Sequence, residues 1–97
     1  MLDHAILSAV AEQMMTDPAV SVGEKSFKVK RTGASRLRTV HFEIEGREYH
    51  AIEQNPEKPS RWGQLARQGR KVVQIRDVSL GKYVAVVVDG KVKEYSK

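Results

Sequence analysis

Two acid–glycine pairs set the most specific constraint on how this chain can fold. Glu45-Gly46 and Asp89-Gly90 each lie between two segments whose residue patterns are typical of strands. Such pairs favour the two-residue turns that join antiparallel strands, because these turns need a positive φ, which glycine adopts without strain. Asp-Gly is the commoner turn pair, so the second signal is the stronger. The sequence therefore predicts two β-hairpins.

The first hairpin has a definite predicted register. If the chain reverses at its acid–glycine pair, Phe42 opposes Tyr49 on one face of the hairpin, and His41 opposes His50 on the other. Side chains alternate between the two faces of a strand, so the first face is apolar and the second is polar. We therefore predict that both aromatic rings are buried together.

The polar face of this hairpin brings together residue types that bind metals. Directly opposed side chains such as His41 and His50 have Cβ atoms about 4.5–5.5 Å apart, and Glu43 opposes Glu48 beside them. Two imidazoles so placed can chelate a divalent cation with help from carboxylates. His4 could add a third imidazole only if the N-terminal helix packed on this face. A solvated strand face is the simpler interpretation, and we predict no metal, no cofactor and no catalytic residue.

Helical periodicity appears in two segments. From Met1 to Thr16, apolar residues recur at spacings of three and four, which predicts a one-sided amphipathic helix that Asp17-Pro18 ends. Ser60 and Gly69 bracket a shorter helix as its N-cap and its C-terminal stop. The segment YVAVVVD is apolar on both faces, which predicts a central strand buried on two sides.

Together these elements predict an α+β fold. An N-terminal amphipathic helix at 1–18 is followed by a linker at 19–25 and an antiparallel β-rich domain at 26–97, which contains the short helix at 60–69. About six strands are expected, with the short helix between the third and the fourth. Short connections favour antiparallel neighbours. Such strands form either a small antiparallel sheet or an SH3-like barrel, and the barrel is our first expectation.

Composition limits the classes of function. The 97 residues include 17 Lys and Arg against 12 Asp and Glu, a net charge of +5 that suits nucleic acid or an acidic protein as a partner. The absence of cysteine excludes disulfides, thiol catalysis and cysteine-type zinc sites. No apolar segment approaches the roughly 18 residues of a membrane span, and the first residues lack the basic start of a signal peptide. We expect a cytoplasmic, non-enzymatic domain with no membrane partner.

Two basic segments, residues 24–38 and 61–71, predict contacts with nucleic acid. Phosphate binding by such segments would release counterions and weaken steeply with salt. Each segment also has a structural interpretation, because lysine-rich edge strands resist aggregation and cations complement the dipole at a helix C-terminus. The candidate nucleic-acid-binding residues are Lys28, Lys30, Arg36, Arg38, Arg61, Arg67 and Arg70.

Binding by base stacking makes a further demand, because it requires exposed aromatic side chains among the cations. The sequence leaves the placement of Tyr83 and Tyr95 open. The aromatic residues assigned to core faces are Phe27, Phe42, Tyr49 and Trp62.

The N-terminal helix supports a second hypothesis, of a protein-interaction or oligomerisation module. If this helix does not pack on its own sheet, its apolar stripe must be buried against another chain, as in a homodimer or a docking complex. Packing on its own sheet is the structural alternative. The candidate protein-interaction residues are Leu2, Ile6, Val10 and Met14.

Overall fold

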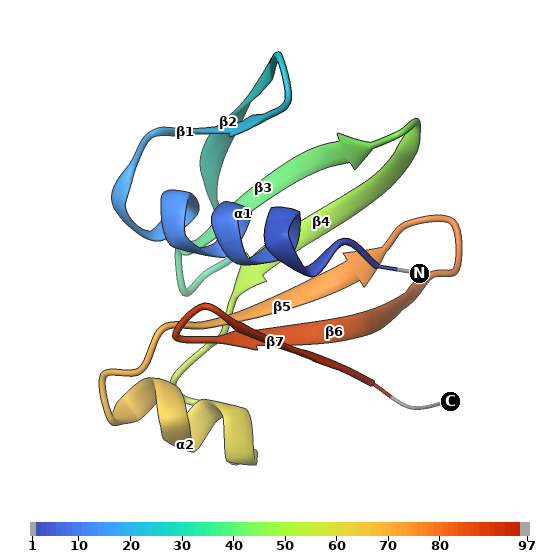
Figure 1. Cartoon of the computed structure of the whole chain (residues 1–97). Helices are drawn as coiled ribbons and strands as arrows, with labels where there is room; N and C mark the ends of the chain where they lie inside the picture. Colours follow the sequence, from blue (N-terminus) through green and yellow to red (C-terminus); the bar gives the residue numbers. More distant parts are fainter. Residues whose placement is uncertain (1, 96–97) are drawn as a thin grey trace.

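The computed structural model describes residues 2–95 and has an α+β fold (Figure 1). The seven strands form one antiparallel sheet in which each strand pairs with the next along the chain. The elements are α1 (His4–Thr16), β1 (Ala19–Val22), β2 (Lys25–Thr32), β3 (Leu37–Ile44), β4 (Arg47–Glu53), α2 (Arg61–Arg67), β5 (Val72–Asp77), β6 (Lys82–Val88) and β7 (Lys91–Glu94). Neither of the two helices within residues 2–95 has the length and apolar character needed to cross a membrane.

The sheet is open, so the predicted SH3-like barrel is wrong. Within residues 2–95, β1 and β7 are the two edges of the sheet, whereas a barrel needs its first and last strands to pair. α1 lies between these edges on the inside of the curled sheet (Figure 1). The backbone N–H of Ser21 in β1 donates to the side chain of Gln13, and the hydroxyl of Ser8 donates to the carbonyl of Gly90 before β7. The helix therefore occupies the place where a barrel would close.

The segment predicted as a linker contains a strand. Ala19–Val22 pairs with β2, where the buried Val20 opposes Phe27, which packs partly buried against the core. This strand depends on its pairing with β2, which the sequence of these four residues does not show by itself. The strand count is therefore seven rather than six, and α2 follows the fourth strand rather than the third.

The first hairpin has the predicted register. Phe42 opposes Tyr49 across β3 and β4, their exposed fractions are 1% and 6%, and their ring centroids are 5.7 Å apart. Glu45 and Gly46 have φ values of 50° and 80°, as a type I′ turn requires. Asp89-Gly90 makes the equivalent turn between β6 and β7, with φ values of 48° and 85°. Both turn predictions are confirmed.

α1 covers one face of the sheet, which we call the inner face. Asp3 caps the helix by accepting a hydrogen bond from the backbone N–H of Ile6 at 3.1 Å, and the helix ends before Asp17-Pro18. Burial of each large apolar side chain contributes about 1.5–3 kcal/mol. The buried residues of this core are Leu7, Val10, Ala11, Met14, Val20, Val40, Phe42, Tyr49, Ala51, Val73, Ile75, Ala85 and Val87.

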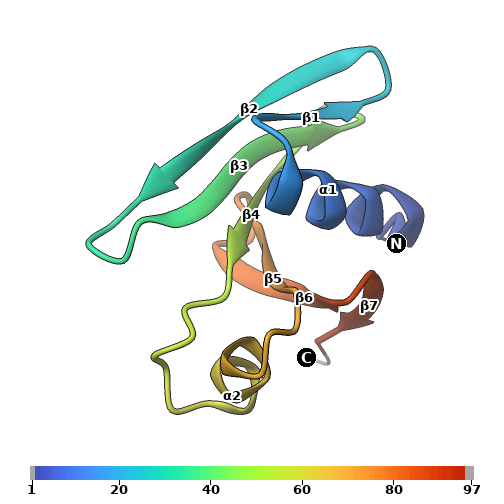
Figure 2. The same ribbon diagram turned by 90° about the vertical axis from the view of Figure 1, so that its left-hand side faces the viewer.

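α2 covers part of the opposite, outer face. It lies across β5 and β6 from α1 (Figure 2). Its N-cap is Ser60, as predicted, and the Ser60 hydroxyl accepts from the backbone N–H of Gly63 at 3.2 Å. Val86 points outward but is fully buried, and its neighbours Ala85 and Val87 are buried on the inner side. Residues 85–87 of β6 are therefore buried on two faces as predicted, although β6 is the sixth of the seven strands rather than a central one.

Candidate nucleic-acid interface

A row of planar side chains crosses the outer face. Strand pairing places His41, His50, Arg76 and Tyr83 opposite one another on β3, β4, β5 and β6. The two imidazole rings stack with centroids 3.6 Å apart and 12° between their planes. The guanidinium carbon of Arg76 lies 5.9 Å from the ring centroid of Tyr83, which is 44% exposed. The row thus presents two imidazoles, a guanidinium and a phenol on one side of the sheet.

A β-bulge places Tyr83 in this row. Ile75 pairs with Ala85, but Arg76 pairs with Tyr83, because the register shifts between these two positions of β5. Val84 is the residue left over by the shift, and it packs against the inner core. An extra residue in one strand of a pair re-aims the side chains that follow it. The bulge therefore sets an aromatic ring beside a cation on the outer face.

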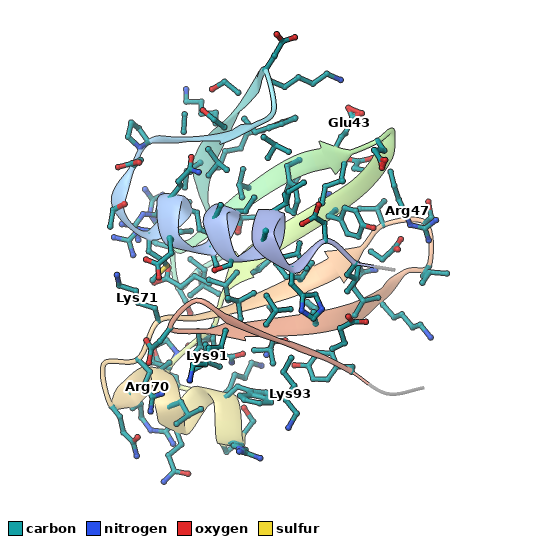
Figure 3. All side chains as sticks on the ribbon, viewed as in Figure 1. Glu43, Arg47, Arg70, Lys71, Lys91 and Lys93 are labelled. Atoms are coloured by element: carbon teal, nitrogen blue, oxygen red, sulfur yellow. The ribbon has the colours of Figure 1, made fainter. Side chains whose placement is uncertain are left out.

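A second group of aromatic and cationic side chains lies where α2 meets β7. The ring centroid of Trp62 is 5.3 Å from the guanidinium carbon of Arg61 and 5.9 Å from the ammonium nitrogen of Lys93. Lys93 pairs with the outward-pointing Val86, and Lys91 and Lys93 both reach toward α2 (Figure 3). Trp62 is only partly buried and is not among the core residues. Trp62 therefore keeps part of its surface exposed and lies outside the inner core.

We call Arg61, Trp62, Arg76, Tyr83 and Lys93 the cation–aromatic surface. Strand β6 joins the two ends of this surface, because it carries both Tyr83 and Val86, the strand partner of Lys93. These two positions of β6 are three residues apart, or about 10 Å at roughly 3.3 Å per residue. Between them, the hydroxyl of Tyr95 donates to the side-chain oxygen of Gln74 at 2.6 Å. Burial raises the pKa of Tyr95, so its hydroxyl remains a neutral donor at neutral pH.

Charge is graded along the outer face. Lys30 lies on β2 beside the histidine pair, whereas Glu43 and Glu48 oppose each other near the β3–β4 turn. Figure 3 shows Glu43 at that end of the sheet and Lys91 and Lys93 at the end near α2. Burial, the neighbouring His50 and Lys30 all lower the pKa of His41. The lowered pKa favours the neutral form of His41 at neutral pH, so the positive charge of this face comes from lysine and arginine side chains, including Lys28 and Lys30 on β2 and the cations near α2.

The stacked histidines are poorly arranged for chelation. Parallel imidazole planes direct the in-plane nitrogen lone pairs side by side, whereas two ligands of one cation must converge on it. His4 lies with α1 on the inner side and contacts Glu94 instead. The Nε2 atom of His50 is 3.7 Å from a carboxylate oxygen of Glu48. No group of three or more metal-binding side chains is formed by residues 2–95.

The first predicted basic segment is divided between the two faces. Lys28 and Lys30 are exposed on the outer side of β2. Arg38 points to the inner side, where it donates to the carboxylate of Glu53 at 3.1 Å. Arg36 lies in the β2–β3 turn with a φ of 54°. Only the two lysines therefore share a face with the cation–aromatic surface.

The second predicted basic segment contributes mainly to the fold. The Arg67 guanidinium donates to the carbonyls of Pro56 and Lys58 at 2.6 and 2.9 Å, so it holds the loop that precedes α2. Arg70 donates to the carboxylate of Asp89 and thereby anchors the β6–β7 turn. Of the cations in this segment, Arg61 alone belongs to the cation–aromatic surface.

The sequence reasoning missed Arg76 and Lys93. The register of the β6–β7 hairpin, readable from Asp89-Gly90, could have placed Lys93 opposite Val86. No local signal could have placed Arg76 beside His50, because that pairing joins strands on either side of α2.

The predicted protein-interaction residues belong to the interior or its margin. Val10 and Met14 have no exposed surface, and Leu2 and Ile6 are partly buried against the core. The apolar stripe of α1 is therefore buried against the sheet of its own domain.

A cavity of about 520 Å³ opens beside the β5–β6 turn, and its lining includes Tyr49 of the inner face, Tyr83 of β6 and Tyr95 directly after β7. Asp77 lies in its wall, is 3% exposed, and accepts hydrogen bonds from Arg47 at 2.7 Å and from the backbone N–H of Leu80 at 3.1 Å. Burial alone would raise the pKa of Asp77, but these hydrogen bonds outweigh it and lower the pKa. The carboxylate thus fixes the turn that leads into Tyr83.

Comparison of the chain with models of protein families, with curated proteins and with solved structures gives no match.

Proposed function

We propose that this chain is a small, non-catalytic domain that binds nucleic acid through the outer face of its sheet. The cation–aromatic surface is the observation that carries this proposal. Arg76 lies 5.9 Å from the ring centroid of Tyr83, and Arg61 lies 5.3 Å from that of Trp62. Binders of nucleic acid combine cations that follow the phosphates with aromatic rings that accept the bases. Both kinds of group alternate on this face.

Electrostatics supports the same surface. The net charge of the chain is +5, and exposed Lys28 and Lys30 extend the positive charge of the outer face to β2. Each phosphate that such cations neutralise releases counterions, so affinity should fall steeply with salt. Replacement of one phosphate-contacting cation should lower the salt slope by about 1.

Fluorescence anisotropy with labelled DNA and RNA at two salt concentrations tests the proposal. The Arg76→Gln/Lys93→Gln double variant should bind more weakly than wild type and show a shallower dependence on salt. The matched control is Lys25→Gln/Arg31→Gln, which removes the same charge from exposed residues on the inner-face side of β2. Absence of binding at low salt would overturn the proposal. Equal losses in the two double variants would overturn its placement on the outer face.

The second hypothesis, protein interaction through the N-terminal helix, has less support. Val10 and Met14 have no exposed surface, so α1 would have to leave the sheet before its stripe could contact another chain. That step would also break the hydrogen bond from Ser8 to Gly90 at 2.7 Å. We therefore retain the nucleic-acid proposal alone.

A further inference from the structure

We infer that the preferred ligand is single-stranded nucleic acid, with one base stacked on Tyr83 and another on Trp62. The inference rests on the proposed function and adds the class of nucleic acid. A base in a duplex is already stacked and paired, so a duplex offers this surface mainly its phosphates. A single strand offers free base faces, and each base that stacks on an aromatic ring strengthens binding independently of sequence.

The two rings are suited to this role because each has a cation over it at cation–π distance. Tyr83 is 44% exposed and contacts Arg76, and Trp62 is partly exposed and contacts Lys93. A ring beside a cation can hold the base and the phosphate of one nucleotide. The arrangement occurs twice, at Tyr83 with Arg76 and at Trp62 with Lys93, and the strand partner of Lys93 lies three residues from Tyr83 along β6. This repetition matches a chain of alternating bases and phosphates.

The charge gradient of the outer face favours one path for the nucleic-acid strand across the sheet. Glu43 and Glu48 lie near the β3–β4 turn, where they would repel phosphates. Lys91 and Lys93 lie at the opposite end, beside α2 (Figure 3). The strand therefore follows β6 and β7 from Tyr83 toward Trp62 and does not cross to the tip of the first hairpin.

The chain contains one tryptophan, so the intrinsic fluorescence of the protein reports directly on this surface. We would titrate the full chain with single-stranded oligothymidylate, with a DNA duplex of equal length and with inorganic polyphosphate. A stacked base should quench Trp62, so oligothymidylate should quench more strongly than duplex or polyphosphate at equal occupancy. Equal quenching by polyphosphate would show that charge alone accounts for binding and would overturn the inference.

Substitution at Tyr83 provides the second arm. Tyr83→Leu should weaken binding of oligothymidylate roughly 5- to 150-fold, the range expected for loss of one stacked base, and should leave polyphosphate binding unchanged. Tyr83→Phe keeps the ring and should bind like wild type. If single strand and duplex bind equally and Tyr83→Leu has no effect, the inference fails while the proposed function stands. If none of the nucleic acids binds at low salt, both fail.

Discussion

Gly63→Ala should loosen the contact between α2 and the loop before it. Gly63 is buried in the helix. A Cβ atom there would lie 3.0 Å from the carbonyl carbon and 3.2 Å from the Cβ of Lys58, and closer still to the Lys58 carbonyl oxygen. That carbonyl cannot swing away freely, because it accepts a hydrogen bond from Arg67 at 2.9 Å. The helix, which carries Trp62, must therefore move.

The magnitude follows from two opposing effects. Alanine is favoured over glycine in a helix by about 1 kcal/mol, so helix propensity alone predicts that Gly63→Ala stabilises the protein. Overpacking a buried site costs about 1–3 kcal/mol, and loss of the Arg67 hydrogen bond costs about 1 kcal/mol more. We expect a net loss of about 1–3 kcal/mol. For a domain of this size, each kcal/mol lowers Tm by roughly 4–8 °C.

Thermal and urea unfolding followed by circular dichroism measure this loss, and the emission of Trp62 reports movement of α2. Gln64→Ala is the matched control, because Gln64 is the exposed neighbour on the same helix, and it should change stability by no more than about 0.5 kcal/mol. If Gly63→Ala is at least as stable as wild type and its Trp62 emission is unchanged, the steric reasoning is refuted.

Three further outcomes are expected. Asp77→Asn should lower the free energy of unfolding by about 1–3 kcal/mol at pH 7, because it removes the charged acceptor of the Arg47 hydrogen bond. The pKa of Asp77 is lowered from 3.8, so the stability difference from wild type in urea unfolding should shrink as the pH falls below 3.8. A constant difference down to pH 2 would contradict this prediction. The pKa of His41 is lowered from 6.5, so the stability linked to its neutral form is complete above pH 6.5 and is lost as the pH falls through the folded-state pKa. His41→Gln should therefore make the free energy of unfolding depend less on pH on the acid side. Parallel pH dependences of wild type and variant would argue against the lowered pKa. Phe42→Ala should lower the free energy of unfolding by about 3–5 kcal/mol, because it leaves a cavity in the core. Denaturant unfolding measures this loss, and a loss below about 1 kcal/mol would mean that the ring is not buried.

Local chemistry was sufficient to predict the hairpins. The turn at Glu45-Gly46 fixes the pairing of its flanking residues, and a side-chain period of two then decides that Phe42 and Tyr49 are buried together. The end of α1 and the N-cap of α2 were predictable for the same reason, because Asp17-Pro18 and Ser60 act on residues next to them in the chain. The prediction of α+β structure with antiparallel neighbours is therefore confirmed.

The cation–aromatic surface was not predictable in this way. It needs β4 to pair with β5 across α2, which sets Arg76 beside His50. It also needs the bulge that turns Val84 inward and Tyr83 outward. Sequence patterns included Lys28, Lys30 and Arg61 among the candidate cations, but they also included Arg67 and Arg70, whose guanidinium groups hold a loop and a turn.

The sequence by itself determined the two hairpin turns, the amphipathic stripe of the first helix and the shared burial of Phe42 and Tyr49. Only the tertiary structure decided that the sheet stays open around α1, that Ala19–Val22 joins it as an edge strand, and that Arg76 meets Tyr83 on the outer face. The physical reason is the range of the interactions. Turn dihedral angles and side-chain alternation act between residues close in the chain, whereas edge pairing, helix placement and the position of a bulge depend on how distant segments share one core.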